Sequence, residues 1–362
     1  MKFFHSLFSK NPSYSKKYIL LGFLFIALLL CAVISVGIGP VSVEPSVVLK
    51  IFANKLGFIT FAEDELVQSS AIVYSIRLPR VILAILVGAT LAISGAALQG
   101  LFRNPLADPT LIGVSSGAAL AAAFIITMGA KLFSFLPPAL YSLLLPIAAF
   151  VGGLVATLLV YIISTRAGKT NVATMLLAGI AINALAAAGI GFLIFTANDV
   201  QIRDLTFWTL GSLGGSVWNS VFKAGPFLLI TIIGLPFFSK QMNIMLLGEN
   251  EARYLGVNTQ FVKKAIIFLA TLGIGAAVAV SGIIGFVGLV VPHLLRLMIG
   301  PDHKFLLPGS ILLGGLLLLA ADLFARMAVV PAELPIGIVT ATFGAPFFLW
   351  LLIRKRSQNS SL

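Results

Sequence analysis

Long apolar runs separated by short polar segments dominate the chain. Runs of this kind reach or approach the ~18 apolar residues that mark a membrane-spanning helix. The first run is longer than a signal-peptide core and lacks a small-residue cleavage site, so we interpret it as a retained span. The pattern predicts an all-α, polytopic membrane protein of about ten spans. The predicted spans are 18–39, 80–100, 112–130, 138–164, 172–197, 222–239, 262–281, 283–299, 305–321 and 335–353.

Composition and charge support this interpretation and give the spans an orientation. Hydrophobic residues make up 59% of the 362 residues and charged residues only 10%. With an even number of spans and both termini inside, most of the 24 Lys and Arg residues lie on the inner side, and most of the 12 acidic residues lie outside. We therefore expect one transmembrane domain, 1–362, with cytoplasmic tails at 1–17 and 354–362. The net charge of +12 reflects topology, and we expect no nucleic-acid partner.

Two pairs of similar segments indicate an internal repeat. The segment GATLAISG at 88–95 returns as GAAVAVSG at 275–282. An LLP triplet followed by GGL occurs at 144–154 and, with the same spacing, at 306–316. The repeats correspond to spans 2–5 and 7–10. Because span 2 runs inward and span 7 outward, the two halves are inverted in the membrane, as in many transporters.

The sequence lacks the residues that several kinds of chemistry require. The Gly168-Lys169-Thr170 triplet has Ile163 where a phosphate-binding loop needs its first glycine. Cys31 is the single cysteine, and none of the three histidines pairs with another at metal-ligand spacing. No charged residue lies clearly at a span centre, which disfavours an ion-coupled secondary transporter, the competing class. No acid–base pair supports a membrane enzyme. We expect neither a bound cofactor nor a metal site.

The polar segment LLGENEARYLGV, 246–257, interrupts the apolar pattern between spans 6 and 7. It has the spacing of a short amphipathic helix with glycines near both ends. On the predicted inner side, a compact charged helix is suited to docking a soluble protein. The alternative is a solvated loop at the membrane surface.

Several long segments resemble the permease subunits of ATP-binding-cassette importers for cobalamin, heme and ferric siderophores, the FecCD type. The resemblance covers the chain from about residue 70 to its C-terminus, with a matching first span. The segments that carry it are SIRLPRVILAILVGATLAISGAALQGLFRNPLADPTLIGVSSGA (75–118), LLGENEARYLGV, SGIIGFVGLVVPHLLRLMIGPDHKFLLPGS (281–310) and ADLFARMAVVPAELPIGIVTATFGAPFFLWLL (321–352).

The resemblance implies a transport subunit in a bacterial inner membrane, surrounded by lipid, and not an enzyme. It implies a homodimer with the transport pathway along the two-fold axis. Two cytoplasmic ATPase subunits would bind ATP and Mg²⁺, and a periplasmic substrate-binding protein would dock outside. The loop between spans 6 and 7 would be the helix that couples the permease to the ATPase. The implied coupling residues are Gly248, Glu249, Ala252, Arg253, Leu255 and Gly256.

The resemblance also implies two further sites. Arg77, Arg80 and Arg326 match arginines that meet acidic residues of the binding protein. Two alternatives are that these arginines extend to lipid headgroups, or that Asp322 pairs with Arg326 in the free protein. The inner gate would lie at the start of span 5, where Val172-Ala173 replaces the hydroxyl-bearing residues of the family. The gate candidates are Thr170, Val172, Ala173 and Thr174.

The segment DVQIRDLTFWTLGSLGGSVW, 199–218, bears on the substrate. It lies on the predicted outer side and combines Phe207, Trp208 and Trp218 with Arg203. A flat macrocycle with propionates suits stacking on aromatic rings plus an arginine. Because the segment resembles heme permeases more than cobalamin permeases, we expect heme, with ferric siderophores and cobalamin as alternatives. The tryptophans are equally typical of the interfacial aromatic belt.

Overall fold

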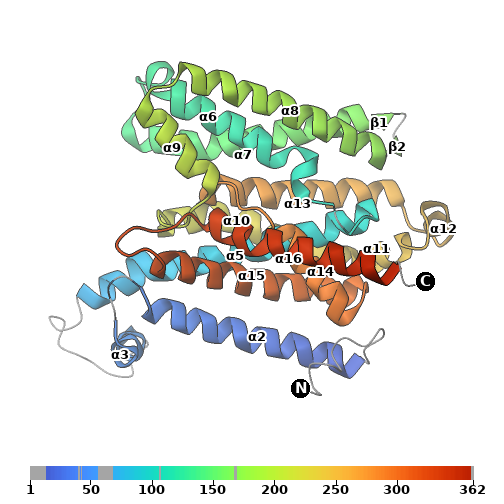
Figure 1. The fold of residues 1–362 in the computed structure, drawn as a ribbon, viewed down its shortest axis with the longest axis horizontal. Coiled ribbons are helices and arrows are strands. Elements are labelled where there is room, and N and C mark those ends of the chain that lie inside the picture. The colour runs from blue at the N-terminus through green and yellow to red at the C-terminus, as the bar shows by residue number, and fades with distance from the viewer. Residues whose placement is uncertain are drawn as a thin grey trace.

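The computed structural model is a bundle of long helices (Figure 1), and it describes residues 14–39, 41, 43–55, 68–105, 107–166 and 169–359. In these residues the only strands are the two-residue pair β1 and β2, which join antiparallel between two long helices. The first half contains α2 (Tyr14–Gly37), α3 (Pro45–Lys55), a π-helical turn (Ile72–Arg77), α5 (Leu78–Phe102), a 3-10 turn (Pro109–Ile112), α6 (Val114–Leu132), α7 (Pro138–Ser164), β1 (Thr165–Arg166), β2 (Lys169–Thr170) and α8 (Val172–Thr196). The second half contains α9 (Asp199–Leu210), α10 (Trp218–Gly234), a 3-10 turn (Leu235–Phe238), α11 (Ser239–Met245), α12 (Glu249–Tyr254), α13 (Thr259–Ser281), α14 (Val287–Ile299), α15 (His303–Met327) and α16 (Ile336–Asn359).

The helices confirm the predicted number of spans. Within the described residues, eight helices are long and apolar enough to cross a membrane, and α14 and the start of α16 are shorter apolar helices. The second span starts earlier than predicted, at Gln68, because the π-helical turn continues directly into α5. The eighth starts later, at Val287, because Gly282 and Phe286 adopt positive φ angles between α13 and α14.

Helix α5 lies at the centre of the bundle and packs against α10, α13, α14 and α15. Glycines allow these close approaches, since small residues supply the packing between membrane helices. A Cβ atom on Gly88 would lie 2.3 Å from the carbonyl oxygen of Gly314 in α15. A Cβ atom on Gly95 would lie 1.9 Å from the carbonyl oxygen of Gly288 in α14. The glycines of the repeated segment therefore fix the position of the central helix.

The helix pairing agrees with the predicted repeat. In the two repeats, α5 corresponds to α13, and α7 corresponds to α15. The repeat therefore predicts that the α5–α15 contact has a counterpart between α13 and α7. Helix α5 packs on α15, and α13 packs on α7. The second repeated segment supplies contacts in both pairs. Gly314 of its GGL triplet meets Gly88, and Phe150, which lies between its LLP and GGL triplets in the first repeat, meets Gly275.

The two ends of the bundle carry different elements. The start of α2 contacts the start of α15, where the ring of Tyr18 lies 5.2 Å from that of Phe305. Helix α12, the β1–β2 pair and the end of α16 lie at this same end, which we call the α12 end (Figure 1). Helices α3 and α9 lie at the opposite end, which we call the α9 end. Most of the predicted N-terminal tail, residues 1–13, lies outside the described residues.

Candidate functional sites

The short helix predicted in 246–257 is present as α12. It begins after Gly248 (φ 150°) and ends before Gly256 (φ 83°). The Val257 N–H donates to the Ala252 carbonyl at 2.9 Å, and the Gly256 N–H donates to the Arg253 carbonyl at 2.9 Å. This closure requires a left-handed residue, which glycine adopts without the Cβ penalty. The glycines therefore give α12 its length.

The predicted coupling residues of α12 divide between two faces. Ala252 and Gly248 are buried, so neither adds side-chain surface for a docked protein. Their part in coupling stays a prediction. Arg253, Leu255 and Gly256 are exposed. Tyr254, which was not among the predicted site residues, is 91% exposed. Tyr254 and the neighbouring Leu255 therefore give α12 two adjacent exposed apolar side chains.

Glu249 connects α12 to the first turns of α13. Its Oε2 atom accepts a hydrogen bond from Lys263 Nζ at 2.7 Å. Its Oε1 atom accepts from Arg253 Nη2 and from Gln260 Nε2, both at 3.2 Å. Lys263 is only 3% exposed, so this ion pair is largely shielded from water on the lysine side. Glu249 is therefore a junction between the two helices.

Lys263 and Gln260 of α13 also contact the predicted gate. Lys263 Nζ also donates to the Thr170 carbonyl at 3.2 Å, and the Thr170 N–H donates to Gln260 Oε1 at 3.2 Å. Val172 and Ala173, together with Glu249, line one cavity of about 550 Å³. The structure thus brings the predicted coupling and gate residues together.

Thr174 plays a different part from the other gate candidates. Its side chain is exposed, and its N–H donates to the Asn171 side chain at 3.1 Å, which caps α8. Lys263 and Gln260 were not among the predicted site residues. A lysine in the first turns of an apolar span was the available signal for Lys263, whereas Gln260 carried none.

The electrostatic environment of Glu249 favours its charged form. Burial opposes ionisation, but the hydrogen bond and charge of Lys263, aided by Arg253 and Thr259, outweigh it, so the pKa of Glu249 lies below its ordinary value of 4.5. A carboxylate of this kind stabilises the fold above its ordinary pKa, and the contribution is lost as pH falls through the lowered pKa.

A pH-dependent loss of stability is therefore expected. The difference in melting temperature between the wild type and Glu249→Gln should have its full size at neutral pH. It should shrink below the ordinary pKa of 4.5, as the pH falls through the lowered pKa of Glu249 and the side chain becomes protonated. Thermal unfolding of the detergent-solubilised protein across this range measures it. Glu251→Gln, on the same helix but exposed, is the matched control and should show no such trend. A difference independent of pH would contradict the ionised state of Glu249.

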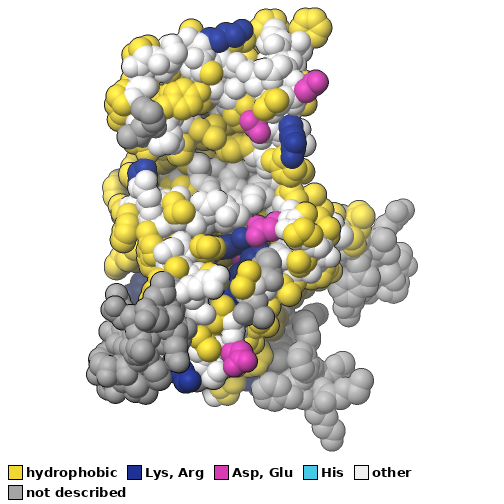
Figure 2. Space-filling view, turned by 90° about the vertical axis from the view of Figure 1, so that its left-hand side faces the viewer, with side chains coloured by type: hydrophobic (Ala, Val, Ile, Leu, Met, Phe, Trp, Pro, Cys, Tyr) yellow, Lys and Arg dark blue, Asp and Glu magenta, His cyan; other side chains and the backbone are white. Residues whose placement is uncertain are grey.

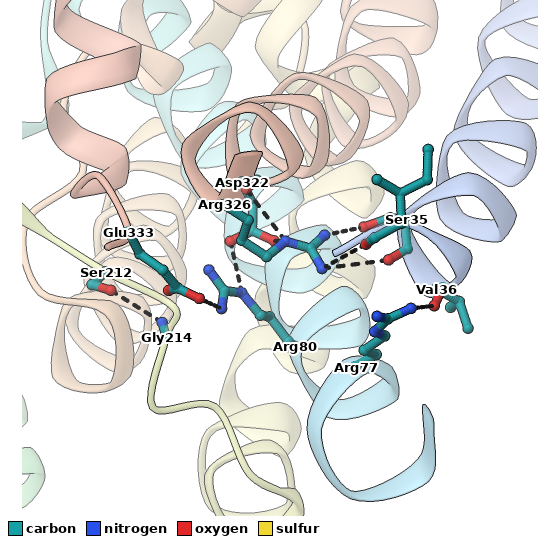
Figure 3. Close-up of polar contacts among 10 residues, drawn as sticks. Ser35, Val36, Arg77, Arg80, Ser212, Gly214, Asp322, Arg326 and Glu333 are labelled. Atoms are coloured by element: carbon teal, nitrogen blue, oxygen red, sulfur yellow. Dashed lines mark hydrogen bonds and ion pairs between the residues drawn. The ribbon is translucent and has the colours of Figure 1, made fainter. Parts of the chain in front are cut away.

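The predicted docking arginines lie at the α9 end, in a buried network (Figure 3). Arg80 Nε donates to Asp322 Oδ1 at 2.9 Å, and Arg80 Nη1 donates to Glu333 Oε1 at 2.9 Å. Arg326 Nε lies 3.1 Å from Asp322 Oδ2. Its Nη2 atom donates to Ser35 Oγ in α2 at 2.5 Å. The network therefore joins α2, α5 and α15 to the loop before α16.

Arg77 has a separate role at the end of α2. Its Nη1 atom donates to the carbonyls of Val36 and Gly37 at 2.7 and 2.6 Å, and its Nη2 atom donates to the Val41 carbonyl. These bonds satisfy carbonyls that the helix end leaves without partners. Arg77 thus fixes the first span to the π-helical turn.

Burial changes the interpretation of these arginines. Arg77, Arg80 and Arg326 are 4%, 5% and 3% exposed. In this conformation their guanidinium groups are therefore largely shielded from a partner protein or a lipid headgroup. The alternative pairing of Asp322 with Arg326 is confirmed. Their role in docking stays a prediction.

The predicted substrate residues lie on α9. Arg203 is exposed, and its guanidinium carbon lies 5.8 Å from the centre of the Phe207 ring, one helical turn away. Trp208 is half-buried and packs against the main core. Trp218 donates from Nε1 to the Tyr74 carbonyl at 2.7 Å, so it has a structural partner. Of the three predicted aromatic residues, Phe207 is therefore the one that the structure places beside the exposed Arg203.

Comparison with known proteins identifies the family of this bundle. The FecCD transport family profile matches residues 27–354. The chain belongs to the FecCD transport family. A solved structure described as a metal-chelate type ABC transporter in an inward-facing conformation has the same fold, with a TM-score of 0.79 and 32% identity over 93% of this chain and 99% of that one. As a FecCD protein, the chain is a multi-pass permease of an ABC importer.

FecCD relatives with different printed substrates match the chain. The hemin transport system permease of Yersinia pestis is 52% identical over 79% of this chain and 84% of that protein. The cobalamin import system permease of Halobacterium salinarum is 45% identical over 78% of this chain and 74% of that protein. An ABC transporter permease of Bacillus subtilis with no assigned substrate is 39% identical over 95% of each chain. Family membership therefore fixes the class of transporter but not its substrate.

Proposed function

We propose that this FecCD permease carries heme into the cytoplasm. The observation that carries the proposal is the 52% identity to a hemin permease, which exceeds the 45% to a cobalamin permease. The Arg203–Phe207 pair on the surface of α9 supports it. A porphyrin face can stack on an exposed ring, and a propionate can accept hydrogen bonds from a guanidinium. A ferric siderophore or cobalamin is the alternative cargo.

The proposal includes the other subunits of the importer. Two copies of the chain form the pathway in a bacterial inner membrane, with lipid around them and both termini in the cytoplasm. Two ATPase subunits, which bind ATP and Mg²⁺, dock at the α12 end. The exposed Leu247, Tyr254 and Leu255 supply apolar contact area for docking. A periplasmic substrate-binding protein docks at the α9 end.

Coupling proceeds through contacts present in the fold. Movement of α12 by the ATPase shifts Glu249, which is held to Lys263 at 2.7 Å. Lys263 and Gln260 hold Thr170, two residues before α8 begins at Val172. The start of α8 therefore moves with α12. This short chain of polar contacts is a physical path from the ATPase surface to the predicted gate.

Reconstituted uptake tests the substrate. Proteoliposomes that contain the complete importer should take up heme delivered by the cognate binding protein, in an ATP-dependent manner that survives collapse of ion gradients. Arg203→Gln should lower heme uptake by about fivefold, the loss expected for one charge-assisted hydrogen bond of about 1 kcal/mol at an exposed site. Lys131→Gln, on the neighbouring α6, is the control for loss of one exposed positive charge.

Separate assays with a ferric siderophore and with cobalamin complete the test. Uptake of either without any uptake of heme would overturn the choice of substrate and leave the permease assignment unchanged. Uptake that requires an ion gradient but no ATP would overturn the assignment of the energy source.

A further inference from the structure

One member of the ion cluster at the α9 end differs from the others. The cluster consists of Arg80, Asp322, Arg326 and Glu333. Asp322 is fully buried and contacts both arginines. The Glu333 side chain is 33% exposed, and among the residues that the structure describes its ion-pair partner is Arg80 alone, from Nη1 at 2.9 Å. Glu333 is therefore the member of the cluster whose carboxylate can move away from the arginines into water.

The position of Glu333 makes its displacement easy. It ends the exposed segment 328–333, between α15 and α16, in which Val329 and Val330 expose their apolar side chains. Its carboxylate lies between Arg80 and the turn in which Gly214 N–H donates to Ser212 Oγ at 3.0 Å (Figure 3). Acidic and basic side chains meet near the middle of this face of the molecule (Figure 2). A protein that covers this face would contact the Glu333 segment directly.

The charge balance of the cluster favours a replacement carboxylate. When Glu333 leaves, the guanidinium groups of Arg80 and Arg326 share the single carboxylate of Asp322. An uncompensated charge in a poorly hydrated site is costly, so the site then attracts another carboxylate strongly. Arg80 Nη1 is the atom exposed by this exchange, and arginine is well suited to hold a carboxylate.

We propose that Glu333 is an internal competitor for docking: its carboxylate occupies the place on Arg80 that a carboxylate of the soluble binding protein takes in the complex. The free permease thereby keeps its arginines neutralised, and docking exchanges one ion pair for another. Exposed Val329 and Val330 add apolar contact to the partner. The proposal rests on the proposed function, since it requires a soluble partner with an acidic contact surface at the α9 end.

The test is the affinity of the cognate binding protein for the detergent-solubilised permease at low salt. Glu333→Gln removes the competing charge and should lower the Kd by about fivefold, as expected for loss of a partly exposed ion pair. The gain should shrink at high salt because of screening. Glu44→Gln is the matched control, since Glu44 is exposed and precedes α3 at the same end, and its carboxylate accepts a hydrogen bond from the exposed Ser46. It changes the net charge equally and should leave the Kd unchanged.

A double substitution locates the effect. Adding Arg80→Gln to Glu333→Gln should abolish the gain, and melting temperatures of each variant confirm that it is folded. Glu333→Ala should show the same gain as Glu333→Gln. If both Glu333 variants bind with the wild-type Kd, or if Glu44→Gln lowers the Kd equally, the inference about Glu333 is overturned and the proposed docking is unaffected. Absence of binding by every variant overturns the proposed docking as well.

Discussion

Asp322→Asn is expected to unfold the α9 end of the bundle and to lower the stability of the permease by about 3–5 kcal/mol. Asp322 is fully buried, and its two oxygen atoms lie 2.9 Å from Arg80 Nε and 3.1 Å from Arg326 Nε. Removing its charge leaves two buried guanidinium groups with one partly exposed carboxylate, that of Glu333. Such a cost exceeds that of most single substitutions, because an unpaired buried charge is among the few large causes of instability.

Thermal unfolding and the yield of monodisperse protein in detergent measure this effect. Glu333→Gln removes a charge from the same cluster at a partly exposed position and should cost about 1 kcal/mol or less. Replacing the Asp322–Arg326 pair together by Asp322→Asn and Arg326→Met should recover part of the loss, since the unpaired charge is then absent. A melting temperature for Asp322→Asn equal to that of Glu333→Gln would show that the cluster does not hold the helices together.

The double substitution Glu249→Ala and Arg253→Ala is expected to uncouple transport from ATP hydrolysis. Glu249 holds Lys263, Gln260 and Arg253, and two of these partners lie on α13. Without Glu249, the buried Lys263 ammonium loses its carboxylate, and α12 can move without moving α13 and Thr170. Substitutions in a coupling network change the coupling by about 0.5–2 kcal/mol. Uptake should therefore fall by about tenfold while the protein is inserted in the membrane.

ATPase activity and substrate uptake, measured in the same proteoliposomes, separate uncoupling from loss of the ATPase. The expected result is hydrolysis near the wild-type rate with reduced uptake per ATP. Glu251→Gln is the control, because Glu251 is exposed on the same helix. Wild-type uptake, with the ATPase co-purifying as before, would contradict a role for the Glu249 junction.

Much of the fold could be predicted from the chain alone. A membrane offers no water to the backbone, so a long apolar run has helix as its only stable form outside a closed barrel. This constraint explains why ten apolar helices match the ten predicted spans. Segment boundaries were less predictable where the backbone departs from the helix, as at Gly282 and Phe286. Their positive φ angles depend on how α13 and α14 meet.

The candidate sites also combine features that local sequence predicts with features that depend on helix packing. Local sequence was sufficient for α12, because glycines at 248 and 256 and charges between them are signals within one segment. It could not show that Ala252 faces inward, since that depends on where α11 and α13 lie. The sequence identified the arginines by type and position, but it could not predict their burial. The partners of Arg80, Asp322 and Glu333, lie 242 and 253 residues away from it in the chain.

The sequence by itself determined the class of protein, the number of spans, the repeat and the segment that forms α12, because each depends on hydrophobicity or on residues close together in the chain. Only the tertiary structure decided which polar side chains meet. It joined Glu249 to Thr170 through Lys263, 93 residues from Thr170, and it buried Arg80 between carboxylates of two other segments. The physical reason is that ion pairs and hydrogen bonds act over a few ångströms. Partners this far apart in the chain become neighbours only when the helices pack.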